Sequence, residues 1–421
     1  MIVIIIIISI YIAMEVSVRY SNSDEHGSSE EMPVNSPFST IPSTFLFTSG
    51  HQSIKTRGIF ERINQAAQSR TGSNDSLQNA IKQAFQRAHK AGKQQPIVVG
   101  AIPFDASQAS CLFVPEHYQV CERQTLVNAA KIADRSPVSA GCVRSLPDEN
   151  QFKQCVTEAI SACQRGTIHK VVLSRVLEIE TDTPVDSDQV MNHLLVQNSH
   201  AHHFRVPLSD GGVLLGASPE LLVRKHLSQV YTNPLAGSAK RQTNQQDDLD
   251  ISQALLNSEK DQYEHRLVID EIRRLLTPHC RSLNIPSQPS LISTAALWHL
   301  SSAISGELED QAMSVLELAN LLHPTPALCG LPTAKARQLI NHLEPFDRGL
   351  FSGIVGWCDE QGNGEWAVII RCATLHPTQV RLFAGAGIVA ASQPALEWLE
   401  TEAKLGTMLN ALAITPSGEQ P

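Results

Sequence analysis

Short apolar segments separated by tight turns constrain the fold of this chain more than any other feature. Residues 353–359 and 365–375 are rich in β-forming side chains, and the Gln-Gly-Asn-Gly sequence at 361–364 between them predicts a hairpin. Further short strands are predicted at 96–103, 171–180, 380–383 and, on either side of a turn at 216–219, within 212–224. Hairpins pair their strands antiparallel, so these strands with interspersed helices indicate an α+β fold and not a regular βαβ series.

Helices are predicted where apolar residues recur at helical spacing, at 77–91, 152–165, 251–276 and 394–412. The longest of them, at 251–276, is predicted to be one continuous amphipathic helix. Ser392 is the predicted N-cap of the last helix because its hydroxyl can accept from a backbone N–H of the first turn.

Polar and glycine- or proline-bearing stretches predict the organisation of the rest of the chain. Residues 131–150 are predicted to be a connector and 237–250 a polar loop. The chain is therefore divided into an apolar start with a mobile lead-in at 1–44, an N-terminal part of the α+β unit at 45–150, and a C-terminal region at 151–415.

Composition excludes several classes of protein. Of the 421 residues, 42% are apolar and 18% are charged, which is typical of a globular chain, and the net charge of −9 argues against a general nucleic-acid binder. None of the nine cysteines forms a CxxC pair, so no zinc or disulfide framework is expected and the cytosol is the expected compartment.

The N-terminal run at 2–13 is almost entirely apolar. It is shorter than the roughly 20 residues that a membrane span needs, and no Lys or Arg precedes it as in a secretory signal. The preferred interpretation is translation from Met14, with a membrane anchor as the alternative, and no stable membrane partner is expected.

Acidic residues on two predicted helices are candidate metal ligands. Glu264 follows Lys260 by four residues in the helix at 251–276, and Glu400 precedes Lys404 by four in the last helix. Two carboxylates from separate helices could hold Mg²⁺, which keeps several waters and uses few protein ligands. Pairs at this spacing are also common on exposed helix surfaces.

Three charged residues next to predicted strands are candidates for catalysis or binding. Desolvation of Lys170, at the start of a strand, could let it act as a base, although an ordinary edge lysine is the simpler interpretation. Glu220, after the turn at 216–219, could have a raised pKa and act as an acid, or it could be an ordinary turn residue. Arg371 inside an apolar strand needs an anionic partner, either within the fold or in a ligand.

Three further positions have two readings each. His299 could be a buried core histidine or a site residue. Gly385 and Gly387 could bring backbone N–H groups close to an anion, or they could form a bulge in a strand.

Taken together, these segments resemble the chorismate-utilising enzymes. The motifs that carry the resemblance, in the order of the family, are His-Lys-Val-Val-Leu-Ser-Arg at 169–175, Gly-Ala-Ser-Pro-Glu at 216–220, Pro-Leu-Ala-Gly-Ser-Ala at 234–239, Ser-Glu-Lys-Asp-Gln-Tyr-Glu-His at 258–265, Trp-His-Leu at 298–300, Leu-His-Pro-Thr-Pro-Ala at 322–327, Glu-Pro-Phe-Asp-Arg-Gly at 344–349, Gly-Ala-Gly-Ile at 385–388 and Glu-Thr-Glu-Ala-Lys at 400–404. Residues 99–105 are in addition similar to the siderophore-pathway members that make isochorismate.

The resemblance implies a fold of two antiparallel β-sheets packed face to face, with helices on the outside, and a Mg²⁺-dependent cleft that binds chorismate. By motif position, Glu264 and Glu400 match the metal ligands, and Lys170 and Glu220 match the catalytic base and acid. The matching substrate-binding positions are Gly237, Ser238, His299, Ala327, Arg371, Gly385 and Lys404.

Three positions bear on which member of the family the chain resembles. Lys170 matches the members that add water, whereas members that use ammonia carry glutamine there. Ala236 stands where aminodeoxychorismate synthases carry the lysine of a covalent route. Ala327 stands where salicylate synthases carry threonine. The resemblance therefore implies conversion of chorismate to isochorismate, by water addition at C2 with loss of the C4 hydroxyl.

Alternatives stay open. Within the family they are a salicylate synthase, an enzyme that aminates chorismate to anthranilate, and an isochorismate-forming enzyme of the menaquinone pathway. Outside catalysis, the alternative is a chorismate-binding protein that has lost its activity. The likeness at 99–105 favours a first step towards 2,3-dihydroxybenzoate and a catecholate siderophore. Functional coupling to an isochorismatase is the partner that this implies, because the reaction is readily reversible and a consuming enzyme would pull it forward.

Overall fold

Antiparallel pairing holds for every strand pair in the described part of the chain, as the tight turns predict. The computed structural model describes residues 44–68, 75–131 and 138–414. Met14 and the predicted lead-in up to residue 43 lie outside the described residues. None of the helices in the described ranges is long and apolar enough to cross a bilayer.

One long hydrogen-bonded ladder contains most strands, and it falls into two layers. The first layer consists, in ladder order, of β5 (Ala140–Leu146), β6 (Lys170–Thr181), β20 (Gln379–Ile388), β19 (Cys372–His376), β8 (Val213–Ser218), β7 (His202–Pro207) and β1 (Leu46–Thr48), with β16 (Gly330–Leu331) beside β6. The second continues with β2 (Ser53–Ile63), β4 (Cys111–Cys121), β3 (Ile97–Ile102), β17 (Ile354–Asp359), β18 (Gly364–Val368), β9 (Leu221–His226), β10 (Gln229–Asn233), β15 (Ile304–Leu308) and β12 (Cys280–Asn284).

The two layers face each other across an apolar core. Phe204 and Phe383 of the first layer pack in one cluster with Val99 and Val355 of the second. The sequence of β3 is apolar throughout because successive side chains point to opposite faces of the sheet and both faces are buried. The expected pair of sheets is thus confirmed, with the addition that β1 pairs with both β2 and β7 and joins the layers into one ladder.

Helices cover the outer faces of both layers. The helices α5 (Ser187–Gln197) and α10 (Pro394–Ala411) pack on the first layer, and α2 (Asp75–Lys90), α7 (Glu259–Leu276) and α8 (Val315–Leu322) pack on the second. A further cluster joins α4 (Glu149–Gln164) and α9 (Thr333–Leu343) to β6. The short α3 (Arg123–Ala130) contacts α5, and a 3₁₀ turn at Thr277–His279 follows α7.

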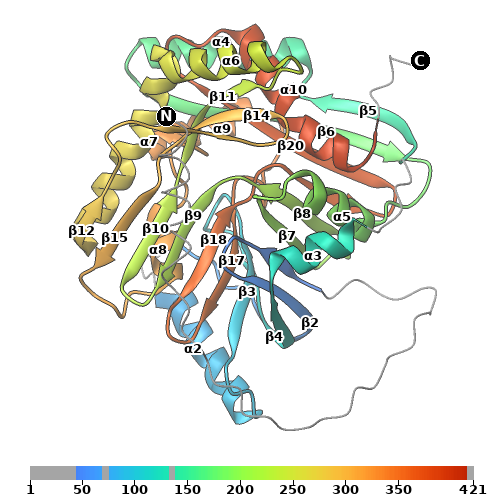
Figure 1. Ribbon diagram of the computed structural model, residues 1–421, viewed down its shortest axis with the longest axis vertical. Coiled ribbons are helices and arrows are strands. Elements are labelled where there is room, and N and C mark those ends of the chain that lie inside the picture. Colours follow the sequence, from blue (N-terminus) through green and yellow to red (C-terminus); the bar gives the residue numbers. More distant parts are fainter. Residues whose placement is uncertain (1–43, 69–74, 132–137, 415–421) are drawn as a thin grey trace. The chain divides into compact units, whose positions relative to one another are not determined.

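A separate three-stranded sheet lies beside these layers. It consists of β11 (Leu235–Lys240), β14 (Leu297–Ser301) and β13 (Ser290–Ser293), and α6 (Gln245–Asn257) packs against it. Figure 1 shows α6 next to β11 and β14, and β17, β18, β9 and β10 side by side in the second layer. We refer to the pair β11–β14 as the ribbon.

Several local expectations are wrong. The helix expected at 251–276 is two helices, because Ser258 leaves helical geometry and its side chain caps α7 by accepting from the backbone N–H of Asp261. The polar loop expected at 237–250 contains the end of β11 and the start of α6. The expected connector at 131–150 contains β5, which pairs with β6. Ser392 is not the N-cap of α10, because Gln393 holds that position.

The strand expected at 365–375 is interrupted at 369–371, and the reason lies in the layers. Its first part, β18, belongs to the second layer, and its second part, β19, belongs to the first. The chain crosses between layers at Arg371. The segment at 212–224 crosses in the same way, because β8 and β9 lie in different layers and Glu220 stands between them.

A buried ion pair ties the segment at 344–348 to β6. Arg348 donates to Glu344 Oε2 at 2.8 Å and to the carbonyl of Val172 at 2.8 Å, while the backbone N–H of Ser174 donates to Glu344 Oε1 at 2.7 Å. Both side chains are almost fully buried. Removal of one partner therefore leaves a buried charge without compensation.

We predict that Arg348→Ala lowers the free energy of unfolding by about 3–5 kcal/mol, because Glu344 loses its counter-charge in a buried site. Chemical denaturation measures the effect. Arg274→Ala is the matched control, since Arg274 forms an exposed pair with Glu271 and its loss should cost less than about 1 kcal/mol. Equal effects of the two substitutions would contradict the prediction.

Candidate active site

One cavity brings together nearly all the residues that the sequence singled out. The space between its walls, including the solvent-filled mouth, amounts to about 640 Å³. The predicted site residues in its wall are Glu220, Gly237, Ser238, Glu264, His299, Ala327, Arg371, Gly385, Glu400 and Lys404. Lys170 does not line the cavity and lies directly behind Glu264.

Lys170 forms a buried ion pair with Glu264. Its Nζ lies 2.9 Å from Glu264 Oε1, and the lysine side chain has essentially no exposed surface. Burial alone would raise the pKa of Glu264, but the charges of Lys170 and Lys260 outweigh it and hold that pKa below its usual value. Glu264 is therefore an ionised carboxylate in the cavity wall.

Glycine at position 387 makes room for this carboxylate. A Cβ at Gly387 would lie 2.1 Å from Glu264 Oε1 and 3.1 Å from Lys170 Cε. The sequence allows Gly387 to be an anion contact or a bulge, and it does not predict that Gly387 makes room for a carboxylate. Its importance could have been read only from the pairing of β20 with β6, which sets it beside Lys170 and Val172.

Glu220 is a buried carboxyl with few partners. It stands where the chain crosses between the layers, and its Oε1 accepts only a long contact, 3.5 Å, from the backbone N–H of Leu235. Burial raises the pKa of Glu220 to about 7, although the charges of Lys170 and Arg371 oppose the rise. Close to neutral pH this group can therefore hold a proton and donate it.

Arg371 is a buried cation whose guanidinium has no hydrogen-bond or ion-pair partner among the described residues. Burial lowers its pKa to about 10, so the side chain stays charged at neutral pH. Its φ of 52° lies in the left-handed region, which non-glycine residues rarely adopt, and the backbone N–H of Ala217 donates to its carbonyl at 3.1 Å. A buried unpaired cation of this kind favours an anionic ligand.

The ribbon supplies the next part of the wall. Ser238 on β11 and His299 on β14 are register partners, and Ser238 Oγ lies 2.9 Å from His299 Nδ1. Burial and the nearby charges of Arg371 and Lys404 hold the pKa of His299 well below its usual value, so the ring is neutral. The buried Nε2 of His299 has no partner in the described residues and is available to a ligand. Gly237 next to Ser238 has a φ of 84°.

Lys404 and Glu400 on α10 complete the wall. Lys404 Nζ donates to Glu400 Oε1 at 2.6 Å and to the carbonyl of Gly385 at 2.8 Å. One turn earlier, Glu397 pairs with Lys260 of α7 at 2.7 Å, and burial with the charge of Glu400 raises the pKa of Glu397 to about 7. The sequence reading did not single out Glu397, although its spacing of three residues from Glu400 was a signal for it.

The donor set in this cavity fits a magnesium ion. No group of three or more His, Cys, Asp or Glu side chains within the described ranges could hold a metal by itself. Mg²⁺ does not need such a group, because it is commonly held by one or two carboxylates together with water and ligand oxygens. Glu264 and Glu400 come from different helices and line the same cavity. These are the two residues that could hold the ion.

The family model described as chorismate binding enzyme matches residues 114–413. The isochorismate synthase EntC of Escherichia coli (strain K12) is 46% identical over 375 residues, 89% of this chain and 95% of EntC. The isochorismate synthase DhbC of Bacillus subtilis (strain 168) is 41% identical over 381 residues, 89% of this chain and 94% of DhbC.

A solved structure agrees with the fold. The crystal structure of a putative 2,3-dihydroxybenzoate-specific isochorismate synthase, DhbC from Bacillus anthracis, superposes with a TM-score of 0.82 at 38% identity. The match covers 89% of this chain and 97% of that one. The arrangement of layers, ribbon and outer helices is therefore shared over nearly the whole length of both chains.

We predict that Glu220→Gln removes a pH-dependent loss of stability. Folding raises the pKa of Glu220 from 4.5 to about 7. The stability that this shift contributes is therefore fully present below about pH 4.5 and is lost as the pH rises through about 7. Glutamine stays neutral, so the variant gains about 2 kcal/mol relative to the parent between about pH 5.5 and pH 8. Denaturant unfolding at both pH values measures this gain, and parallel pH dependences would contradict it.

We predict that Gly387→Ala weakens Mg²⁺ binding at least about tenfold, because the added methyl group forces the Glu264 carboxylate to move. Isothermal titration with MgCl₂ measures the affinity. Gly406→Ala is the matched control, since a Cβ at Gly406 on α10 meets no atom within 4 Å. Unchanged affinity in Gly387→Ala would show that Glu264 does not hold the ion.

Proposed function

This chain belongs to the family of chorismate-binding enzymes, and from that premise we propose that it is an isochorismate synthase. Two relatives that carry this activity in their names are 46% and 41% identical over 89% of the chain. The observation that carries the proposal is the presence, in one cavity, of Glu220 and Arg371. Glu220 is a buried carboxyl that can hold a proton near neutral pH, and Arg371 is a buried cation without a partner in the part of the chain that the structure describes.

The reaction needs an acid for the leaving hydroxyl. A new C–O bond forms between water and C2 of chorismate, the ring double bonds shift, and the C4–O bond breaks. Glu220 donates its proton to the departing C4 oxygen, which leaves as water. Hydroxide is a poor leaving group, so a positioned general acid with a pKa near the working pH is the efficient solution.

The reaction also needs a base for the attacking water, and Lys170 is the proposed one. Its position behind Glu264 and its complete burial set it apart from the exposed lysines of the chain. Lys170 can accept a proton only as a neutral amine, so it must first release the ammonium proton that it holds in the ion pair with Glu264. The proton that the amine then takes from water at C2 balances the proton that Glu220 gives at C4. Substrate and product are isomers, so the protein must return both groups to their starting states after each turnover.

The remaining residues bind a dianion. Arg371 and Lys404 supply positive charge, and the backbone at Gly237 and Gly385 can approach the ligand closely because neither residue carries a side chain. Held by Glu264 and Glu400, Mg²⁺ would neutralise and orient a substrate carboxylate. His299 is neutral and offers a ring nitrogen to the ligand without adding charge.

The pathway and the cellular context extend the proposal. We place the enzyme at the first step towards 2,3-dihydroxybenzoate, because the structural relative from Bacillus anthracis is described as a 2,3-dihydroxybenzoate-specific isochorismate synthase. An isochorismatase is the proposed functional partner, because product removal drives a readily reversible isomerisation. All nine cysteines are free, which supports a reducing compartment such as the cytosol.

Product analysis tests the proposal. Purified protein is incubated with chorismate and MgCl₂ in H₂¹⁸O, with and without ammonium, and the products are resolved by chromatography, mass spectrometry and proton NMR. We expect isochorismate with one solvent ¹⁸O at C2 and no pyruvate. Salicylate with pyruvate would identify a salicylate synthase, anthranilate would refute water as the nucleophile, and unlabelled isochorismate would refute attack by solvent water.

We predict that Lys170→Ala and Glu220→Gln each lower kcat by about 10²–10⁴-fold, the usual share of a general base or acid. Steady-state assays of chorismate consumption measure the effect. Lys153→Ala is the matched lysine control, because Lys153 pairs with Glu149 on the outer surface of α4. Near-normal turnover of either active-site variant would remove that residue from its proposed role.

A further inference from the structure

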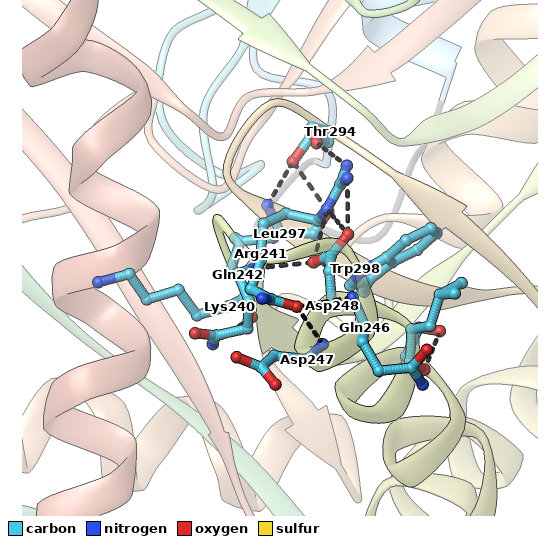
Figure 2. Close-up of polar contacts among 12 residues, drawn as sticks. Lys240, Arg241, Gln242, Gln246, Asp247, Asp248, Thr294, Leu297 and Trp298 are labelled. Atoms are coloured by element: carbon cyan, nitrogen blue, oxygen red, sulfur yellow. Dashed lines mark hydrogen bonds and ion pairs between the residues drawn. The ribbon is translucent and has the colours of Figure 1, made fainter.

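Figure 2 shows a dense polar cluster around Asp248, next to Arg241 and Trp298. Its centre is Asp248 on α6, whose carboxylate accepts from Arg241 Nε at 2.8 Å, from the backbone N–H of Gln242 at 2.8 Å and from Trp298 Nε1 at 3.0 Å. Arg241 Nη2 adds a further contact to Asp248 at 2.7 Å. We call Arg241, Asp248 and Trp298 the clamp.

The clamp joins both strands of the ribbon to one helix. Arg241 directly follows β11, and Trp298 lies in β14. The Arg241 guanidinium also lies 4.6 Å from the centre of the Trp298 ring, and its backbone N–H donates to the carbonyl of Ala296 at 2.9 Å. The Arg241 side chain keeps the pKa of Asp248 at about 2, so the carboxylate is charged at all working pH values.

The clamp is one register step from the site. Trp298 pairs with Ala239, and the next pair along the ribbon is Ser238 with His299, both in the cavity wall. The ribbon belongs to a sheet separate from the main ladder, so ladder hydrogen bonds do not fix its orientation. Its inner end is held by His265 of α7, whose Nδ1 lies 3.2 Å from the carbonyl of Ala236. The clamp holds the other end.

We propose that Asp248 is a positioning residue for the reaction: through Arg241 and Trp298 it holds the ribbon in the orientation that presents Ser238 and His299 to chorismate. This inference rests on the proposed function. The Arg241 side chain is one-third exposed, and partly exposed ion pairs contribute little to global stability. Loss of the ion pair between Asp248 and Arg241 should therefore change the positions of Ser238 and His299 more than it changes the free energy of unfolding.

The effect should fall on substrate binding. Gly237 and Ser238 contact the bound ligand in its ground state as well as in the transition state, so disorder of the ribbon weakens both equally. Asn at position 248 keeps the size of the side chain but removes its charge. One carboxylate oxygen becomes an NH₂ group, to which the Arg241 guanidinium cannot donate a hydrogen bond. We expect Asp248→Asn to raise KM for chorismate about tenfold and to lower kcat less than about threefold.

Matched variants separate positioning from folding. Asp188→Asn is the control, because Asp188 also forms an ion pair with a buried arginine, Arg205, but lies on α5, which packs on the first layer, whereas α6 packs on the ribbon. We expect no change in KM for this variant. Trp298→Phe keeps the ring under Arg241 and removes one hydrogen bond, so its KM should lie between those of the parent and Asp248→Asn. Arg241→Lys provides the same test from the other partner if Asp248→Asn does not fold.

A second readout is independent of turnover. In protein with ¹⁵N-labelled histidine, the ring signals of His299, assigned by their loss in His299→Gln, should shift in Asp248→Asn and stay in place in Asp188→Asn. Unchanged KM together with unchanged His299 signals in a folded Asp248→Asn variant would overturn the inference. Failure of the parent protein to form isochorismate would overturn the proposed function, while the His299 signals would still test the clamp.

Discussion

The burial of charge in one cavity is the constraint on which the rest of this structure depends. Lys170, Glu220, Glu264 and Arg371 are all almost completely removed from solvent. An isolated buried charge is too costly to keep, so each of them must be paired, neutralised or left for a ligand. The structure uses all three solutions, because Lys170 pairs with Glu264, Glu220 favours its protonated form, and Arg371 has no partner among the described residues. The difference between these solutions separates the candidate acid from the candidate anion contact.

The layered architecture explains how residues distant in sequence reach the same cavity. Glu220 and Arg371 stand at the two points where the chain leaves one layer of the ladder for the other, between β8 and β9 and between β18 and β19. Backbone hydrogen bonds connect the two crossings. The N–H of Val368 donates to the carbonyl of Glu220, and the N–H of Ala217 donates to the carbonyl of Arg371. A regular strand would have paired these backbones along the ladder and directed successive side chains to alternate faces. The irregular backbone, including the left-handed conformation of Arg371, is thus what brings two charged groups into the gap.

Local patterns in the sequence predicted part of the strands and helices, among them β3, β6 and α10. They missed others, such as β2, β4 and α5, and they missed the events that depend on partners. The hairpin of β17 and β18 and the buried strand β3 were readable, because turn residues and apolar runs carry those signals locally. The interruption at 369–371 was not, since Ile369 and Ile370 are as apolar as their neighbours and only the pairing with β8 and β9 separates the strand into two. The family motifs pointed to the residues that line the cavity, whereas the need for glycine at 387 follows from a carboxylate contributed by another helix.

The cavity has two kinds of wall, and their difference has a mechanical consequence. Glu220, Arg371 and Gly385 belong to or lie between strands of the main ladder, which many hydrogen bonds and an apolar core keep in place. Ser238 and His299 belong to the ribbon, which α6 and α7 hold through side chains such as Asp248 and His265. Groups that transfer protons must keep fixed distances, so their place in the rigid wall suits them. Groups that bind the ligand must allow it to enter, and a wall fixed by a few side-chain contacts can yield without disturbing the ladder. The same division of the wall explains why loss of the clamp should act on KM and loss of Glu220 on kcat.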